Sequence, residues 1–91
     1  MERKRDRLGV IHDVLGIIQK HNNSIKPTPL LRYSNLSSKS FSDYLDALLK
    51  KKFVKELFDN KNKKHITLTD KGFKFLEKYK TITNFIEEFE L

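Results

Sequence analysis

The sequence predicts an α+β fold that is mostly helical, in which three helices, a β-hairpin and a long final helix follow one another. Three observations lead to this prediction. Three segments carry apolar residues at spacings of three and four, which is typical of amphipathic helices. Before the last of these segments, two apolar runs flank the polar stretch "DNKNKK", as the strands of a hairpin do. The chain has 91 residues, enough for one small core, so we expect residues 1–91 to form a single domain.

Basic residues outnumber acidic ones, and the excess is unevenly placed. The whole chain carries a net charge of +7, whereas residues 69–91 carry a net charge of −1. A basic excess confined to one part of a chain favours a polyanionic partner such as nucleic acid; a merely soluble basic surface is the alternative. The chain has no cysteine, which excludes disulfides, thiolate metal sites and thiol catalysis.

The first predicted helix covers about residues 4–21. Its apolar residues form one stripe that we expect to face the core: Leu8, Ile11, Val14, Leu15 and Ile18. His21, Asn22 and Asn23 suit the end of this helix, because asparagine tolerates the left-handed conformation that closes many helices.

A short helix of about two turns is expected after the break "NNSIKPTP". Thr28 can cap this helix with its hydroxyl group, and Pro29 fits its first turn because proline has no N–H to leave unsatisfied. We expect its apolar residues, and the one in the turn that follows, to contact the core: Leu30, Leu31, Tyr33 and Leu36.

The third predicted helix covers about residues 37–51, with Ser37 as its cap. One face is apolar and is expected to be buried: Phe41, Tyr44, Leu45, Leu48 and Leu49. The other face is polar: Lys39, Ser40, Ser42, Asp43, Asp46 and Lys50.

The hairpin and the final helix complete the chain. Five apolar residues flank the hairpin tip, residues 59–64: Val54, Leu57, Phe58, Ile66 and Leu68. The tip exceeds a tight two-residue turn, so we expect it to project from the domain. Thr69 can cap a last helix of about 20 residues that ends near the C-terminus.

This order of elements is that of a winged helix-turn-helix domain. In that motif a short helix steadies a second helix, which offers the polar residues of its first turn to the major groove of DNA. A basic hairpin tip can reach neighbouring phosphates. The segments "RDRLGVIHDVLGII", "YSNLSSKSFSDYLDALLKK" and "ITLTDKGFKFLEKY" resemble the archaeal small winged-helix DNA-binding proteins and transcription regulators, over about Arg5 to Tyr79.

The resemblance implies a recognition helix that begins near Ser37 and a wing at residues 59–64. The residues that correspond to the groove-facing start, beside the cap Ser37, are Ser38, Lys39, Ser40 and Ser42. The residues that correspond to the wing are Lys61, Lys63 and Lys64. Serine hydroxyls can bind phosphates or base edges, and lysine can bind phosphate or guanine, although both residue types also simply solvate helix starts.

Further basic residues are candidates for phosphate contacts. An N-terminal cluster consists of Arg3, Lys4, Arg5 and Arg7. It is either an arm that follows the phosphate backbone or a solvated chain start. Arg32 on the short helix is a further candidate.

Two aspartates on the third helix are unexpected beside DNA. Asp43 and Asp46 each lie four residues from a lysine, so we expect intrahelical ion pairs of Lys39 with Asp43 and of Asp46 with Lys50. Such pairing implies that only the first turn of the helix lies near DNA. The alternative is a carboxylate that accepts a hydrogen bond from cytosine N4.

The final helix carries more apolar side chains than one small core can hide. The residues expected to form a homodimer interface within about residues 69–91 are Phe75, Tyr79, Ile82, Phe85, Ile86 and Phe89. Val10, Val14 or Ile17 of the first helix can join them. The resemblance also implies such a dimer. The alternative is a helix that folds back across the first one.

The sequence gives no sign of an enzyme or of a cofactor. His12, His21 and His65 lack the spacing of metal ligands, no glycine-rich phosphate loop is present, and the serines have no evident His/Asp partner set. No segment is apolar enough to cross a membrane, and we expect a cytoplasmic, nucleoid-associated protein. The predicted function is duplex DNA binding by a transcription regulator. A non-specific chromatin-associated protein and a protein-interaction module are the alternatives.

Overall fold

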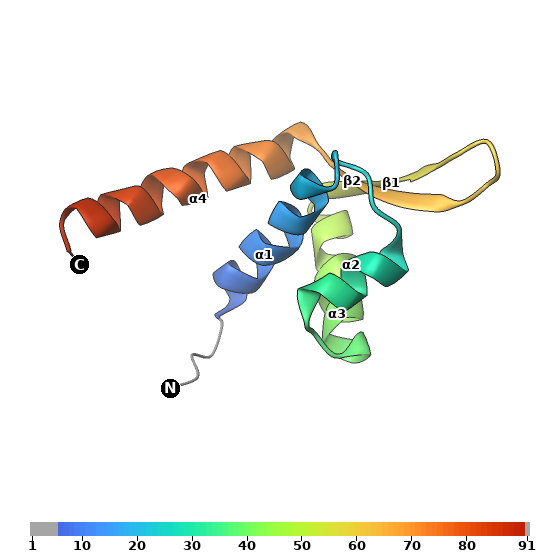
Figure 1. Cartoon of the computed structure of the whole chain (residues 1–91), viewed down its shortest axis with the longest axis horizontal. Coiled ribbons are helices and arrows are strands. Elements are labelled where there is room, and N and C mark those ends of the chain that lie inside the picture. The colour runs from blue at the N-terminus through green and yellow to red at the C-terminus, as the bar shows by residue number, and fades with distance from the viewer. Residues whose placement is uncertain (1–5, 91) are drawn as a thin grey trace.

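The computed structural model describes residues 6–90. Its elements are α1 (Arg7–Lys20), α2 (Pro27–Ser34), α3 (Ser38–Lys50), β1 (Val54–Phe58), β2 (Lys64–Leu68) and α4 (Asp70–Glu88) (Figure 1). This order confirms the predicted fold, which is mostly helical with one antiparallel hairpin and a long C-terminal helix. Of the predicted basic cluster, Arg7 opens α1, whereas Arg3, Lys4 and Arg5 lie outside the described residues.

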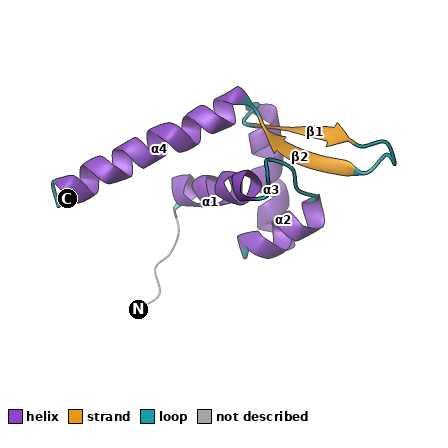
Figure 2. Ribbon diagram, turned by 45° about the horizontal axis from the view of Figure 1, so that its top comes forward, coloured by secondary structure: helices purple, strands orange, loops and turns teal. Residues whose placement is uncertain are grey.

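The core lies where α1 meets the other elements. In Figure 2, α1 lies between α4 and the pair formed by α2 and α3, and the hairpin extends to one side. The buried apolar residues come from every element and from the loop after α1: Val10, Ile11, Val14, Leu15, Ile18, Ile25, Leu30, Phe41, Leu48, Val54, Ile66, Leu68 and Leu76. The predicted stripe of the first helix was wrong at Leu8, which is 56% exposed because it lies in the first turn, beyond the core.

Within residues 6–90, side chains cap three of the four helices. Asp6 accepts a hydrogen bond from the Gly9 amide at the start of α1, at 2.7 Å. Ser37 and Thr69 cap α3 and α4, as predicted from the sequence. The prediction that Thr28 caps the second helix was wrong. That helix begins two residues earlier than predicted, because proline at position 27 suits the first helical position, and Lys26 precedes it without a side-chain cap.

A tight turn joins α2 to α3. Asn35 adopts the left-handed conformation with φ 59°, and the buried Ser34 hydroxyl donates to the Leu31 carbonyl at 2.7 Å and accepts from the Leu36 amide at 3.3 Å. Leu30 and Ser34 define the buried face of α2. Tyr33 points away from this face and is 56% exposed, so its predicted place in the core was wrong.

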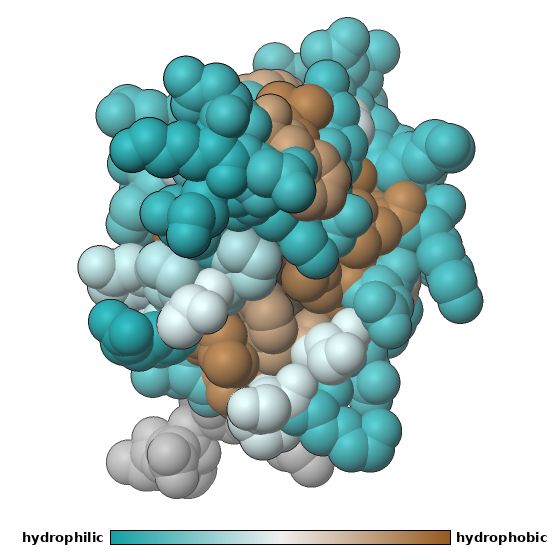
Figure 3. Space-filling model, turned by 90° about the vertical axis from the view of Figure 1, so that its right-hand side faces the viewer, coloured by the Kyte–Doolittle hydropathy of each residue, from teal (hydrophilic) through white to brown (hydrophobic). Residues whose placement is uncertain are grey.

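The hairpin joins the core at its base and leaves it at its tip. Val54 pairs with Leu68 at the base, and Phe58 pairs with Lys64 at the far end. Because β2 begins at Lys64, the hairpin tip comprises residues 59–63. Leu57 and Phe58 are 47% and 59% exposed, since the strands extend beyond the helices. Figure 3 looks onto this end of the molecule, where hydrophobic surface lies between hydrophilic side chains.

The start of α4 is fixed against the segment that precedes β1. The Thr69 hydroxyl donates to the Lys52 carbonyl at 2.5 Å, and the Gly72 amide donates to the Thr69 side chain at 3.2 Å. A Cβ atom at Gly72 would collide with the Phe53 carbonyl oxygen, so only glycine allows this close approach without a shift.

The two halves of α4 differ in their surroundings. In the first half, Leu76 is buried, Phe75 packs edge-on against Phe53, and the Tyr79 ring stacks on His12 with centroids 4.2 Å apart. The second half leaves the body on the side opposite the hairpin (Figure 1). Its apolar side chains are 40–59% exposed: Ile82, Phe85, Ile86 and Phe89. None of the helices within residues 6–90 combines the length and the apolar character needed to cross a membrane.

Candidate nucleic-acid interface

The first turns of α3 present polar side chains to solvent. Ser38, Lys39 and Ser42 are exposed, and Ser40 is half-buried at the edge of this face. The Ser37 hydroxyl oxygen accepts a hydrogen bond from the Ser40 amide at 3.1 Å, so this serine also closes the helix start. The amphipathic pattern fixes this arrangement, because Phe41 and Leu48 are buried on the opposite side of the helix.

One of the two predicted intrahelical ion pairs is present. Lys39 Nζ lies 3.3 Å from Asp43 Oδ2, and the two side chains are 86% and 65% exposed. Such an exposed pair adds little stability and leaves the ammonium free to exchange partners. The second predicted pair is not formed: within residues 6–90, Asp46 and Lys50 make no ion pair.

The Asp59 carboxylate organises the hairpin tip. Its Oδ1 atom accepts hydrogen bonds from the backbone amides of Lys61 and Lys63, both at 2.9 Å. The Asn62 amide donates to the Asp59 carbonyl at 2.9 Å, and Asn62 takes the left-handed conformation with φ 61°. The tip is therefore folded around one carboxylate, and the Lys61 and Lys63 side chains are exposed on it.

The Asp59 carboxylate also takes part in a hydrogen-bond network of side chains. Asp59 Oδ2 lies 3.0 Å from His65 Nε2, and His65 Nδ1 lies 3.3 Å from the Ser24 hydroxyl. The hydrogen bond from the Lys63 amide, followed by that with His65, lowers the pKa of Asp59 below the value usual for an aspartate. A carboxylate that is more acidic in the folded chain stabilises the folded state when it is ionised.

The wing lysines differ in their partners. Lys64 Nζ lies 3.3 Å from Glu56 Oε2 across the two strands, so its charge is partly neutralised. Lys61 and Lys63 make no ion pair with any other described residue. Arg32 is exposed on α2. The Arg7 guanidinium lies over the Tyr44 ring, 5.6 Å from its centroid, and so packs against α3.

Comparison with known proteins shows what kind of domain presents these residues. The family model described as winged helix-turn-helix matches residues 4–87. The chain belongs to the winged helix-turn-helix family. No curated protein sequence matches the chain.

Solved structures of winged-helix proteins are similar to it. MepR, a transcription regulator of the Staphylococcus aureus multidrug efflux pump MepA, has a TM-score of 0.77 and 22% identity over 87% of this chain and 59% of the MepR chain. The chain thus spans about three fifths of the length of MepR. Sso10a-2, a DNA-binding protein from Sulfolobus solfataricus, has a TM-score of 0.73 and 17% identity over 94% of this chain and 86% of its own.

A third similar structure is a winged-helix DNA-binding protein from STIV. It has a TM-score of 0.72 and 19% identity, over 88% of this chain and 91% of its own. Together with the family match, these structures confirm the predicted resemblance to archaeal small winged-helix DNA-binding proteins and to transcription regulators. At these identities the likeness concerns the fold.

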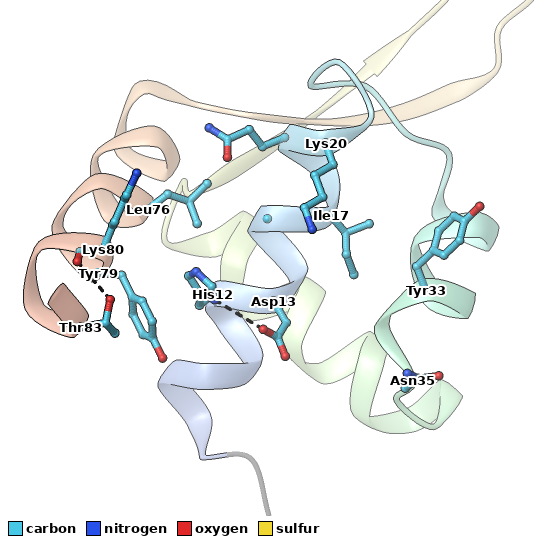
Figure 4. Close-up of a pocket in the computed structure, with 12 residues that line it drawn as sticks. His12, Asp13, Ile17, Lys20, Tyr33, Asn35, Leu76, Tyr79, Lys80 and Thr83 are labelled. Carbon is cyan, nitrogen blue, oxygen red and sulfur yellow. Dashed lines mark hydrogen bonds and ion pairs between the residues drawn. The ribbon is translucent and has the colours of Figure 1, made fainter. Parts of the chain in front are cut away.

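This winged helix-turn-helix chain also has a groove between α1, α2 and α4, with a volume of about 590 Å³. Figure 4 shows His12 and Tyr79 facing each other on one side of it and Tyr33 and Asn35 on the other. His12 Nδ1 lies 3.4 Å from Asp13 Oδ1. Among the residues that the structure describes, no three histidine, cysteine or acidic side chains are grouped as metal ligands.

One serine has a His/Asp partner set that the sequence does not reveal. Ser24, His65 and Asp59 lie in a row, which superficially resembles a nucleophile with its base. The two nearest backbone amides are not free to bind an oxyanion, because the Ser24 amide donates to the His21 carbonyl and the Ile25 amide donates to the Ile66 carbonyl. An aspartate that opens a loop is a known turn signal, but no sequence pattern places Ser24 beside it.

Basic residues near the start of the hairpin were also missed. Lys52, Lys55 and Lys71 line a shallow hollow beside Thr69 and Asp70. The "KKK" run at positions 50–52 signals this charge, but only the fold brings the start of α4 beside it. Lys26 is exposed directly before α2 and was not singled out either.

Proposed function

We propose that the protein binds duplex DNA through the first turns of α3 and through the hairpin tip, as a transcription regulator without enzymatic activity. The observation that carries this proposal is the structure of the hairpin tip. The Lys61 and Lys63 side chains are exposed and make no ion pair within residues 6–90, while the backbone amides of both residues are held by the Asp59 carboxylate. Winged-helix relatives named as DNA-binding proteins or as transcription regulators support the same function.

The two contact regions have different roles in this proposal. Ser38, Lys39 and Ser42 enter the major groove, where hydroxyl and ammonium groups bind base edges or phosphates. Lys61 and Lys63 bind phosphates outside that groove and fix the orientation of the domain. Lys64, Arg32 and the N-terminal residues Arg3, Lys4 and Arg5 add phosphate contacts, and Ser37 and Ser40 lie at the edge of the groove-facing surface.

The acidic residues of α3 limit how deeply the helix enters. Asp43 and Asp46 are exposed on α3, and phosphates repel carboxylates. Lys39 is paired with Asp43. A contact between Lys39 and a base therefore requires this ion pair to open, or both side chains to contact the base together. We therefore expect contact to end after about the first turn and a half of α3, with phosphate contacts supplying most of the affinity.

A salt series tests this function. Affinity for a short DNA duplex should fall linearly with salt on logarithmic axes, with a slope of about −0.9 for each phosphate neutralised. A regulator should also prefer some duplex sequences over others, whereas a chromatin-associated protein should bind all of them alike. If the protein does not bind duplex DNA at low salt, the proposed function is wrong and a protein partner for α3 becomes the better interpretation.

We also infer that the second half of α4 pairs with the same helix of a second copy. Ile82, Phe85, Ile86 and Phe89 are exposed together on a helix that extends from the body. Phe75 and Tyr79 contribute less than the sequence suggests, because Phe53 and His12 cover them within one chain. Of the first-helix residues that could join the interface, Val10 and Val14 are buried and Ile17 is half-buried.

A two-fold dimer of this kind would suit DNA binding. Such symmetry places two α3 helices on one duplex, and each supplies its own set of phosphate contacts. The back-folded alternative fits only the first half of α4, which packs on α1 and against Phe53, the residue before β1. The oligomeric state in solution decides between the two arrangements of the second half.

A further inference from the structure

We propose that Asp59, His65 and Ser24 form a clasp that orders the hairpin tip, joins it to the body of the domain, and thereby positions Lys61 and Lys63 on DNA. The inference rests on the proposed DNA binding and names the residues that prepare the wing for it. Asp59 and His65 act here through their neighbours, as positioning residues.

The first part of the clasp is the carboxylate inside the tip. Asp59 Oδ1 accepts from both the Lys61 and the Lys63 amides at 2.9 Å, so one side chain fixes the backbone on both sides of Asn62. The Asp59 amide also donates to the Lys63 carbonyl at 3.0 Å. Without these bonds, the free tip would have to be ordered when DNA binds, and the loss of backbone conformational entropy would weaken binding.

The second part of the clasp joins the tip to the body. His65 uses Nε2 toward Asp59 Oδ2 at 3.0 Å and Nδ1 toward the Ser24 hydroxyl at 3.3 Å. Ser24 belongs to the loop between α1 and α2, and its neighbour Ile25 pairs with Ile66 of β2 through two backbone hydrogen bonds of 3.2 and 2.8 Å. The tip is thus tied to the segment that leads into α2.

The clasp can be distinguished from a purely electrostatic effect of Asp59, because the two predict opposite changes in DNA affinity when Asp59 is removed. Asp59 is a negative charge on the surface proposed to meet phosphates. Removing a repulsive charge should strengthen DNA binding if Asp59 has no other role. If Asp59 positions the two lysines, removing it should weaken DNA binding although the net charge of the protein rises.

The experiment compares three variants with the wild type by DNA affinity across a salt series and by amide hydrogen exchange of the free protein. Asp59→Ala removes the charge and both acceptors. Asp59→Asn removes the charge but keeps one side-chain oxygen for the two amides. Asp46→Ala is the charge-matched control, since it removes one exposed carboxylate from α3, where it makes no ion pair within residues 6–90.

We expect Asp59→Ala to bind about tenfold more weakly, with a salt slope flatter by up to about 1.8 because two lysine contacts are lost. Exchange of the Lys61 and Lys63 amides should accelerate in the same variant. Asp59→Asn should keep the protection of these amides and bind as well as the wild type or better. Asp46→Ala should bind about twofold more tightly.

Tighter binding by Asp59→Ala, with unchanged exchange at both lysine amides, would overturn the clasp. Loss of the whole fold in that variant would be visible by circular dichroism. In that case His65→Ala decides, because it keeps the Asp59 carboxylate but removes the link between the tip and Ser24. The clasp predicts weaker DNA binding by this variant, and binding equal to that of the wild type would overturn it. If the wild type does not bind DNA, the proposed function fails. The exchange rates still show whether Asp59 orders the tip: unchanged rates in Asp59→Ala would overturn the clasp in that case too.

Discussion

Replacing Ile86 and Phe89 with aspartate should convert a dimer into a folded monomer. Ile82, Phe85, Ile86 and Phe89 are each 40–59% exposed in one chain. Fully burying a large apolar side chain contributes about 1.5–3 kcal/mol, so covering the exposed half contributes about 1 kcal/mol per side chain. The double substitution removes two such side chains from each copy. The expected loss of about 4 kcal/mol corresponds to roughly a thousandfold weaker dimer.

Sedimentation velocity over a concentration series measures this change. The wild type should be a dimer at high micromolar concentration, and Ile86→Asp with Phe89→Asp should be a monomer with unchanged circular dichroism. Thr81→Asp with Asn84→Asp is the matched control, because it adds the same charge to exposed polar positions of α4 and leaves its exposed apolar side chains intact. A monomeric wild type would refute the proposed interface, and so would equal dissociation of the control. Neither result would bear on DNA binding itself.

Three further predictions concern stability. Leu48→Ala should lower the free energy of unfolding by about 2–5 kcal/mol, because Leu48 is 2% exposed. Leu57→Ala, at a 47% exposed position, should lower it by less than about 1 kcal/mol, and equal losses in chemical denaturation would contradict the core assignment. Gly72→Ala should destabilise the folded protein by about 1–3 kcal/mol, because the added Cβ atom collides with the Phe53 carbonyl oxygen. Gly16→Ala, with open space around it, should stabilise the folded protein by up to about 1 kcal/mol, and thermal melting in the reverse order would refute the close approach at Gly72. Because the pKa of Asp59 is lowered, its ionised form stabilises the folded state above about pH 4, and this contribution is lost as the pH falls through the lowered pKa. If Asp59→Asn and the wild type showed the same pH dependence of unfolding, this contribution of Asp59 would be contradicted.

Local patterns were enough to predict the order of the elements. The apolar spacing of three and four located α1, α3 and α4 to within a few residues, since each helix buries one face. Ser37 and Thr69 were predicted as caps because their hydroxyls need only the next turn of their own helix. The start of α2 was misplaced, because both prolines of "KPTP" suit a first turn and only the packed chain decides between them.

The distant contacts could not be predicted from the sequence. Ser24 and His65 are 41 positions apart, and only the pairing of Ile25 with Ile66 brings them together. The covering of Phe75 and Tyr79 likewise depends on the angle at which α4 crosses α1. The sequence shows an excess of apolar side chains on that helix, but it cannot divide them between the core of one chain and a free surface.

The central claim is that duplex DNA meets the hairpin tip, and the salt dependence of DNA binding tests it most directly. Lys61→Ala with Lys63→Ala should weaken binding and flatten the salt slope by about 1.8 relative to the wild type. Lys74→Ala with Lys78→Ala removes the same charge from exposed positions of α4 and should leave the slope unchanged. Equal changes in both double variants would mean that only net charge matters, and an unchanged slope in the tip variant would contradict the proposed contact surface.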